Sequence, residues 1–154
     1  MVVRILLVED DENKRNRVTK FLAEQCPDDV LKHADSLVAG LRAIKLETPD
    51  MVILDMTLPN YSEARIGGNN PMRPFGGREF LRQVRRMRIP VSVVVLTQFE
   101  TFGSPPNVVD LAHLDGELKS EFTEIYLGAV YYHASQTSWA NQILVARSKV
   151  ANQK

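Results

Sequence analysis

Three short apolar runs constrain the fold of this chain more than any other feature. They are rich in Val, Ile and Leu, are almost uninterrupted and lie far apart, at 3–8, 51–54 and 91–96. Strands buried on both faces of a sheet have this composition, whereas strands with one face in water alternate apolar and polar residues. The runs therefore predict a parallel sheet with helices on both sides.

Segments with apolar residues at helical spacing lie between and after these runs. They predict five helices, with apolar stripes over 18–22, 37–44, 80–87, 111–122 and 139–150. Ser36 is a candidate N-cap of the second helix, Pro90 ends the third, and Thr137 or Ser138 is the candidate cap of the last. Another strand is predicted at 29–34, because parallel neighbours are joined by helical crossovers, and the residues Gly128-Ala129-Val130-Tyr131-Tyr132 predict a fifth strand. A β-α unit repeated five times predicts a doubly wound α/β domain.

Composition bounds the function. The chain has 154 residues, 44% of them apolar, which suits one domain with its own core. The lone Cys26 excludes an internal disulfide framework and a multi-cysteine metal site, and it favours a reducing compartment, so we expect a cytoplasmic protein. Arg4 interrupts the first apolar run, which is therefore neither a signal sequence nor a membrane span. With 19 basic and 19 acidic residues, the net charge gives no reason to expect binding to membranes or, directly, to nucleic acid.

Polar residues follow the predicted strands where a doubly wound domain has its working site, at the carboxyl ends of the strands. Glu9 and Asp10 follow the first strand, Asp55 ends the third, and Thr97 with Gln98 follows the fourth. Carboxylates gathered at one edge repel one another unless a cation neutralises them, and Mg²⁺ prefers oxygen ligands of this kind. With the metal bound, Asp55 could attack phosphorus to form an aspartyl phosphate, and the Thr97 hydroxyl could hydrogen-bond the new group.

Four blocks of the sequence resemble the response-regulator receiver domain of two-component signalling. They are Ile5-Leu6-Leu7-Val8-Glu9-Asp10-Asp11-Glu12, Met51-Val52-Ile53-Leu54-Asp55-Met56-Thr57-Leu58-Pro59, Val93-Val94-Val95-Leu96-Thr97 and Gly128-Ala129-Val130-Tyr131-Tyr132. The resemblance implies a flavodoxin-like fold with five parallel strands. It also implies that the protein signals rather than acts as an enzyme, beyond weak self-phosphorylation or self-dephosphorylation. Its implied partners are a histidine kinase or another phosphodonor and an unidentified downstream protein.

The resemblance assigns roles to individual residues. Asp55 would accept the phosphoryl group, Glu9 and Asp10 would be the acidic pair that binds Mg²⁺ with Asp55, and the Thr57 backbone carbonyl would complete the metal site. Thr97 would be the switch hydroxyl and Tyr132 the aromatic that reorients with it. Residues 1–154 would form one stand-alone receiver without an output domain. The resemblance also suggests that two copies pair through the last helix and the fifth strand.

One position departs from the family pattern. Receivers carry a lysine near the end of the fifth strand, and the corresponding residue here is Ser135. A hydroxyl gives a neutral hydrogen bond where the ammonium gives a charge-assisted one of about twice the strength. His133 lies two residues earlier, on the same strand face, and is interpreted as a histidine without a charge role. An arginine from the long segment after Asp55, Arg65 or Arg73, is a hypothetical replacement for the lysine.

Two segments are longer than the family pattern. The stretch 60–77 holds four of the eight glycines, and the span 99–124 is irregular at first and then acidic and amphipathic. We expect both to contact partners or to cover the site. Charge is also separated: seven arginines against one acid lie between 65 and 88, and five acids against one lysine between 110 and 124. The arginines are interpreted as a solvated helix face that pairs with acids elsewhere, rather than as a binding surface.

Three functions compete at this point. The first is a phosphorylation switch at Asp55, and the second is a pseudo-receiver that binds partners without phosphorylation. The third is a phosphatase of the dehalogenase type, which also forms an aspartyl phosphate. Those enzymes need a second aspartate two positions after the nucleophile, and Thr57 is there instead. The switch is therefore ranked first and the phosphatase last.

Overall fold

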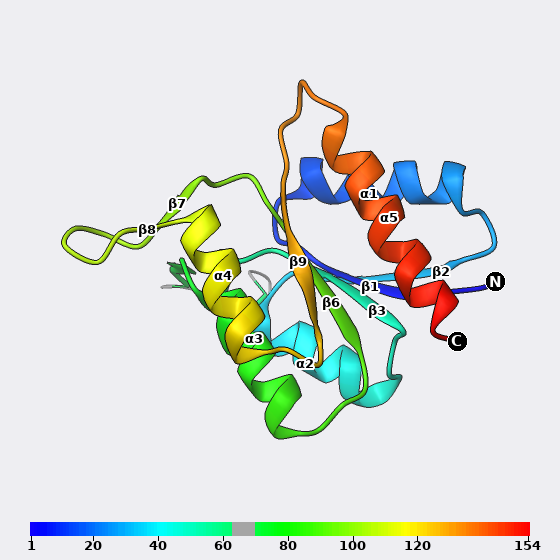
Figure 1. Cartoon of the computed structure of the whole chain (residues 1–154), viewed down its shortest axis with the longest axis horizontal. Coiled ribbons are helices and arrows are strands. Elements are labelled where there is room, and N and C mark those ends of the chain that lie inside the picture. Colours follow the sequence, from blue (N-terminus) through cyan, green and yellow to red (C-terminus); the bar gives the residue numbers. More distant parts are fainter. Residues whose placement is uncertain (63–69) are drawn as a thin grey trace.

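A five-stranded parallel sheet forms the centre of the structure, a computed structural model that describes residues 1–62 and 70–154 (Figure 1). The strands are β1 (Arg4–Val8), β2 (Val30–Ala34), β3 (Met51–Leu54), β6 (Ser92–Thr97) and β9 (Tyr126–Tyr131), in the order β2-β1-β3-β6-β9. The helices are α1 (Glu12–Gln25), α2 (Leu37–Leu46), α3 (Gly76–Arg86), α4 (Leu111–Glu121) and α5 (Ser138–Asn152). The predicted β-α repeat and the flavodoxin-like fold are confirmed, and the strand order reverses between β1 and β3.

The helices cover the two faces of the sheet in separate layers. In Figure 1, α1 and α5 lie on the upper right side of the sheet, and α2, α3 and α4 lie on the opposite, lower left side. Alternate residues of β1 point to the two layers, because Ile5 belongs to the cluster with α1 and α5 and Leu6 to the cluster with α2, α3 and α4. None of the helices in the described part of the chain is long and apolar enough to cross a membrane.

Local signals explain most element boundaries. Ser36 and Asp11 are N-caps, and their side chains accept hydrogen bonds from the amides of Ala39 and Lys14. Thr137 occupies the N-cap position of α5 but makes no capping side-chain hydrogen bond. The fifth strand begins at Tyr126, two residues before the predicted start, because Tyr126 already pairs with Val93 of β6. A bulge follows, since Gly128, with φ of +144°, pairs with the next residue of β6 and leaves Leu127 unpaired.

Two small antiparallel pairs were not predicted. Strand β4 (Leu58–Pro59), just before the first predicted insertion, pairs with β5 (Met72–Arg73) inside it, and the last two residues of the insertion, Gly76 and Gly77, already belong to α3. Strands β7 (Thr101–Phe102) and β8 (Val109–Asp110) form a hairpin that extends away from the sheet in Figure 1. The second predicted segment, 99–124, also contains α4, one of the five helices of the repeat, so the part beyond the repeat is shorter than predicted.

The basic and acidic segments face each other across α3 and α4. Arg78 bonds Glu117 and Glu121 at 2.9 and 3.0 Å, and Arg82 lies 3.6 Å from Glu121. Arg85 donates to the Glu121 carbonyl. The interpretation of the α3 arginines as pairing with acids elsewhere is confirmed for Arg78 and Arg82, whereas Arg85 bonds a backbone carbonyl. Charges that are separated along the sequence therefore pair between α3 and α4.

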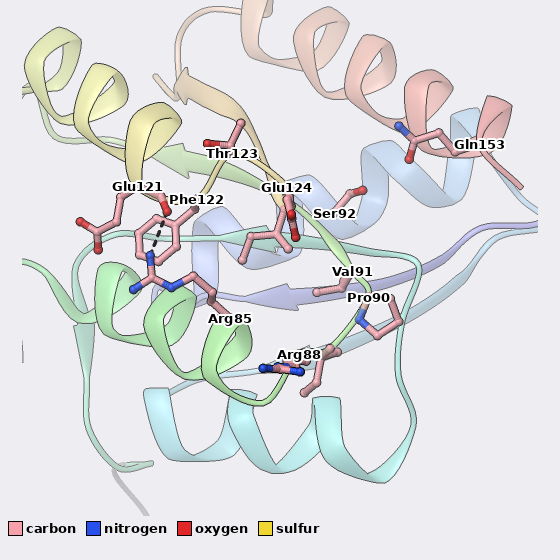
Figure 2. A pocket seen from close by; sticks show the side chains of 12 residues that line it. Arg85, Arg88, Pro90, Val91, Ser92, Glu121, Phe122, Thr123, Glu124 and Gln153 are labelled. Atoms are coloured by element: carbon pink, nitrogen blue, oxygen red, sulfur yellow. Dashed lines mark hydrogen bonds between the residues drawn. The ribbon is translucent and has the colours of Figure 1, made fainter.

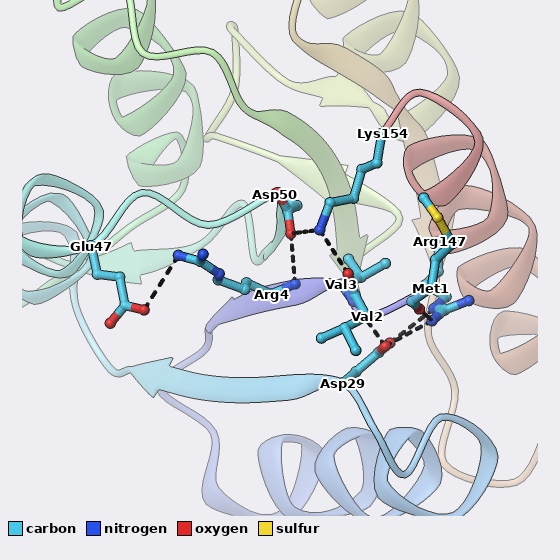
Figure 3. Close-up of polar contacts among 9 residues, drawn as sticks. All are labelled: Met1, Val2, Val3, Arg4, Asp29, Glu47, Asp50, Arg147 and Lys154. Carbon is cyan, nitrogen blue, oxygen red and sulfur yellow. Dashed lines mark hydrogen bonds and ion pairs between the residues drawn. The ribbon is translucent and has the colours of Figure 1, made fainter.

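A second set of ion pairs ties the chain ends to the amino edge of the sheet (Figure 3). The Asp29 carboxylate accepts two hydrogen bonds from Arg147, at 2.8 and 2.7 Å, and one from the Val3 amide. Lys154 bonds Asp50, which also accepts from the Arg4 amide. Because the Asp29 side chain is 1% exposed, its charge depends on Arg147 for compensation.

Replacing Arg147 by Met is expected to destabilise the protein by about 2 kcal/mol, the range for hydrogen bonds to a charged group. The buried Asp29 carboxylate loses both bonds from the guanidinium and keeps the one from Val3. Urea unfolding followed by circular dichroism measures the change. Lys149→Met is the matched control, because Lys149 is an exposed residue of the same helix, and it should change stability by less than about 0.5 kcal/mol.

The same pair predicts a pH dependence. Burial raises the pKa of Asp29, but the bonds from Arg147 and the Val3 amide outweigh it and hold the pKa below its usual range. A carboxyl whose pKa is lower in the folded state stabilises the fold fully above its unfolded pKa of about 3.9 and loses that contribution as the pH falls through the folded pKa. Wild-type protein should therefore lose more stability than Arg147→Met when the pH falls below about 4, and equal losses would contradict the assignment.

Candidate functional site

Three carboxylates meet at the carboxyl edge of the sheet, where the strand order reverses. Glu9 follows β1, Asp55 follows β3, and Asp10 lies beside Glu9. One oxygen from each residue lies within 4.8 Å of the others. Glu9 and Asp55 are 1% and 3% exposed, and Asp10 is half-buried. The sequence prediction that these residues share one edge is confirmed.

Parallel pairing of the central strands produces this juxtaposition. Val8 of β1 lies opposite Leu54 of β3, so the residues that follow them leave the sheet side by side. The Asp55 amide donates to the Val8 carbonyl at 3.0 Å, and the Glu9 amide donates to Ala34 at 2.9 Å. Backbone bonds therefore hold both carboxyl-bearing residues in place.

A lysine enters the cluster from α1, and the sequence analysis missed it. The Lys14 side chain is 1% exposed, and its Nζ lies 2.5 Å from Glu9 Oε1, 2.6 Å from the Leu96 carbonyl and 3.6 Å from Asp55 Oδ1. Lys14 is four residues before Val18 and eight before Leu22, so all three face the core from one side of α1. The sequence signal for its burial is the position of Lys14 in the apolar stripe of α1, just after the acidic residues 9–12.

Burial dominates the protonation of the cluster. It raises the pKa of Glu9 to about 8 and that of Asp10 to about 6, and the charge of Glu9 adds to the shift of Asp10. Burial also raises the pKa of Asp55, while the Lys14 ammonium acts against the shift at Asp55 and at Glu9. If all three carboxylates ionise, their charges and the Lys14 ammonium sum to −2 in the site. A divalent cation would remove that excess.

The residues present fit Mg²⁺. The donors are hard oxygens, as this ion requires, and Asp55 Oδ1 is a buried oxygen without a hydrogen-bond partner. Buried polar atoms in native proteins are nearly always paired, so such an oxygen calls for a ligand. Thr57, whose backbone carbonyl is the fourth predicted ligand, lies in a half-buried bend two residues after Asp55.

The two predicted switch residues lie next to each other at the ends of β6 and β9. Thr97 is fully buried, its hydroxyl accepts from the Phe99 amide at 3.2 Å, and its carbonyl accepts from the Tyr132 amide at 2.7 Å. Tyr132 is 4% exposed, and its ring lies 5.2 Å from that of Trp139 and 5.6 Å from Lys14 Nζ. The two residues thus connect the acidic cluster to α5.

The position of the family lysine is an exposed turn. The Ser135 hydroxyl pairs with His133 Nδ1 at 2.7 Å, and the Ser135 amide donates to the same nitrogen at 3.1 Å. Both residues are exposed. Arg73, one hypothetical replacement for the lysine, is an exposed residue of β5, and Arg65 lies outside the described residues.

A cavity of about 810 Å³ lies at the opposite edge of the sheet, near the starts of β6 and β9 (Figure 2). One of its charged groups is already in use, because Arg85 donates to the Glu121 carbonyl and stacks on Phe122 with its guanidinium carbon 4.7 Å from the ring centre. It contains none of the carboxylates of the cluster. The chemistry that the sequence predicts belongs to the other edge.

The relatives of this chain include response regulators. The chain is 38% identical over 146 residues to the uncharacterized protein y4jR of Sinorhizobium fredii, a match that covers 94% of this chain and 97% of that protein. It is 22% identical over 144 residues to the Detocs response regulatory protein DtcB of Enterobacter cloacae, covering 92% and 96% of the two chains. No family model matches the chain.

Solved structures with the same fold are receiver domains and response regulators. A CheY-like response regulator receiver domain protein of Methanospirillum hungatei superposes with a TM-score of 0.62 at 18% identity, covering 99% of this chain and 97% of the other. The response regulator TrrA of Thermotoga maritima, solved in complex with Mg²⁺-BeF, gives 0.63 at 19% identity, covering 96% and 98%. Receivers of this kind are signalling proteins rather than enzymes. From its fold and its relatives, the chain belongs to the response-regulator receiver domains.

Proposed function

We propose that this receiver is a Mg²⁺-dependent phosphoacceptor whose phosphorylation at Asp55 changes its binding to another protein. The observation that carries the proposal is the Asp55 carboxylate, which is buried, keeps Oδ1 without a hydrogen bond and lies within a cluster of oxygen ligands. The proposal treats residues 1–154 as one receiver unit that acts through a partner in the cytoplasm.

The reaction is transfer of a phosphoryl group from a histidine kinase or a small phosphodonor. A carboxylate oxygen of Asp55 attacks phosphorus, and the bond from phosphorus to the donor atom breaks with its electron pair leaving on the donor, which takes up a proton. Glu9, Asp10, Asp55 and the Thr57 carbonyl would hold Mg²⁺. When bound, the ion would offset the negative charge of the phosphoryl oxygens. Support for the metal comes from the cluster itself and from the Mg²⁺-BeF complex of TrrA.

Signal output would begin at Thr97. Its hydroxyl accepts a bond from Phe99 in the present structure, and a phosphoryl group on Asp55 would offer it a competing partner. The Thr97 carbonyl is bonded to Tyr132, so a displacement there would reach the ring of Tyr132 and Trp139 of α5. A groove of about 350 Å³ between α4, β9 and α5, beside the exposed Val145, is the proposed contact surface for a partner or a second copy.

A second candidate function is a pseudo-receiver that binds its partner without phosphorylation. The exposed Ser135, where the family has a lysine, favours it. In that case the β7–β8 hairpin and the segment around β4 and β5 would be contact surfaces.

Incubation with acetyl phosphate or phosphoramidate separates the two functions. The switch predicts one phosphoryl adduct by intact-mass spectrometry in the presence of Mg²⁺ and none after chelation, because the clustered carboxylates repel the incoming group without a cation. A protein that takes up no phosphoryl group from either donor, and that does not bind beryllofluoride as an analogue of that group, would leave the pseudo-receiver as the function.

A further inference from the structure

The segment that follows β9 contributes no cationic side chain of its own to a phosphoryl group. The residues from Tyr132 to Thr137 include no lysine or arginine, and the Ser135 hydroxyl is paired with His133. A phosphoryl group carries two negative charges near neutral pH, and its stabilisation in proteins relies on charge-assisted bonds. The cation must therefore come from elsewhere if Asp55 is phosphorylated.

Lys14 is the only cationic side chain within 4 Å of Asp55 among the described residues. Its ammonium has three donors, of which Glu9 Oε1 and the Leu96 carbonyl take two at 2.5 and 2.6 Å. Asp55 Oδ1, at 3.6 Å, is too distant for a hydrogen bond and has no other partner. One donor therefore remains available beside the oxygen that would be phosphorylated or would bind the metal.

Two arginines of α1 also lie near this edge of the sheet, but their guanidinium groups bond backbone carbonyls. Arg15 donates to the Glu9 carbonyl and Arg17 to the Ala134 carbonyl. Lys14 differs because its whole side chain is buried and its ammonium bonds Glu9 and the Leu96 carbonyl. Turning outward would break both bonds. Its position is therefore set before any phosphoryl group arrives.

We infer that Lys14, from the first turn of α1, supplies the cation for the phosphoryl group on Asp55 in place of the lysine absent at Ser135. This inference rests on the proposed phosphorylation of Asp55. It also links the phosphoryl group to the carbonyl of Leu96, the residue before Thr97, so the same side chain contacts the acceptor site and the strand that carries the switch hydroxyl. Lys14 would thus be a phosphoryl-binding residue and a positioning residue for the end of β6.

The test uses beryllofluoride as a phosphoryl analogue and Mg²⁺ alone as the second ligand, titrated separately. Trp139 fluorescence measures the binding of each ligand, because Trp139 contacts Tyr132 and Tyr132 lies beside Lys14. Lys14→Met should weaken beryllofluoride binding at saturating Mg²⁺ about tenfold or more, the effect of one charge-assisted bond. Mg²⁺ alone should bind more tightly to the variant, because an internal cation no longer competes for the carboxylates.

Adding Ser135→Lys to Lys14→Met should restore most of the beryllofluoride affinity by placing an ammonium at the family position. Lys20→Met, an exposed residue of the same helix, is the matched control and should bind both ligands like the wild type. If Lys14→Met unfolds below the assay temperature, the same titrations are carried out with Lys14→Gln, which keeps a hydrogen-bond donor for the Leu96 carbonyl.

The outcomes are distinct. Wild-type beryllofluoride affinity in Lys14→Met, or equal weakening of both ligands without rescue by Ser135→Lys, would overturn the role of Lys14 and leave phosphorylation of Asp55 standing. A wild-type protein that binds no beryllofluoride would overturn the proposed function, and the inference with it. Weaker beryllofluoride binding together with tighter Mg²⁺ binding supports the inference, since a structural defect would weaken both.

Discussion

Asp55→Asn is expected to abolish phosphoryl uptake completely and to leave the protein folded. An amide nitrogen replaces one carboxylate oxygen, so the nucleophile is lost with almost no change of shape. The metal-free variant should also be more stable than the wild type, because burial raises the pKa of Asp55 and the ionised carboxylate opposes folding at neutral pH. Intact-mass spectrometry after treatment with acetyl phosphate and thermal melting in a chelator measure the two effects.

Asp28→Asn is the control for this substitution, since Asp28 is exposed in the turn after α1. It should take up phosphoryl groups and melt like the wild type. If Asp55→Asn still forms the adduct in full, another residue accepts the phosphoryl group. If Asp55→Asn is much less stable than the wild type, the carboxylate is part of the structural framework rather than a strained functional group.

Gly77→Ala is expected to destabilise the protein by about 3 kcal/mol, near the upper end for overpacking. Gly77 is the second residue of α3, and its amide donates to the Met56 carbonyl at 2.8 Å. A Cβ at this position would lie 2.6 Å from the Asp55 carbonyl oxygen and 2.9 Å from Met56 Cα, both backbone atoms that cannot rotate away. The start of α3 must then move off the segment that carries Asp55, so phosphoryl uptake should also fall. Urea unfolding and the rate of adduct formation check both effects.

Gly116→Ala is the matched control for Gly77→Ala, because the same substitution is expected to stabilise the protein rather than destabilise it. Gly116 is exposed in α4, and an added Cβ would meet no atom within 4 Å. Alanine should therefore stabilise the protein by up to about 1 kcal/mol through its helix propensity. If both variants were equally destabilised, close packing of α3 against the Asp55 backbone would not be the cause of the effect at Gly77.

The sequence allowed the sheet and its carboxylate edge to be predicted because both follow from patterns close to the backbone. The continuous apolar runs identify buried parallel strands, and Glu9, Asp10 and Asp55 lie directly after such runs. Parallel strands with their carboxyl ends at one edge then bring the acids together. Even the weakly apolar strand at 30–34 could be predicted, because the connections between parallel strands require it.

Lys14 was missed, although it is in line with an apolar stripe, because a lysine is normally interpreted as exposed. Its burial depends on three partners that lie far apart in the sequence, namely Glu9, Asp55 and the carbonyl of Leu96. Charge complementarity across the folded site therefore decides where it lies. The pairs β4–β5 and β7–β8 were missed for a different reason, since strands of two residues carry no detectable periodicity.

Chemical mapping of the modified residue tests the central claim most directly. An acyl phosphate on a carboxylate is reduced by borohydride to an alcohol, which converts a phosphorylated aspartate into homoserine. Wild-type protein treated with Mg²⁺ and acetyl phosphate, then with borohydride, should yield the tryptic peptide that contains residue 55 with homoserine at that position, and protein treated in chelator should not. Homoserine at another aspartate, or none in protein that retains its fold and binds Mg²⁺, would contradict the assignment of Asp55 as the phosphoacceptor.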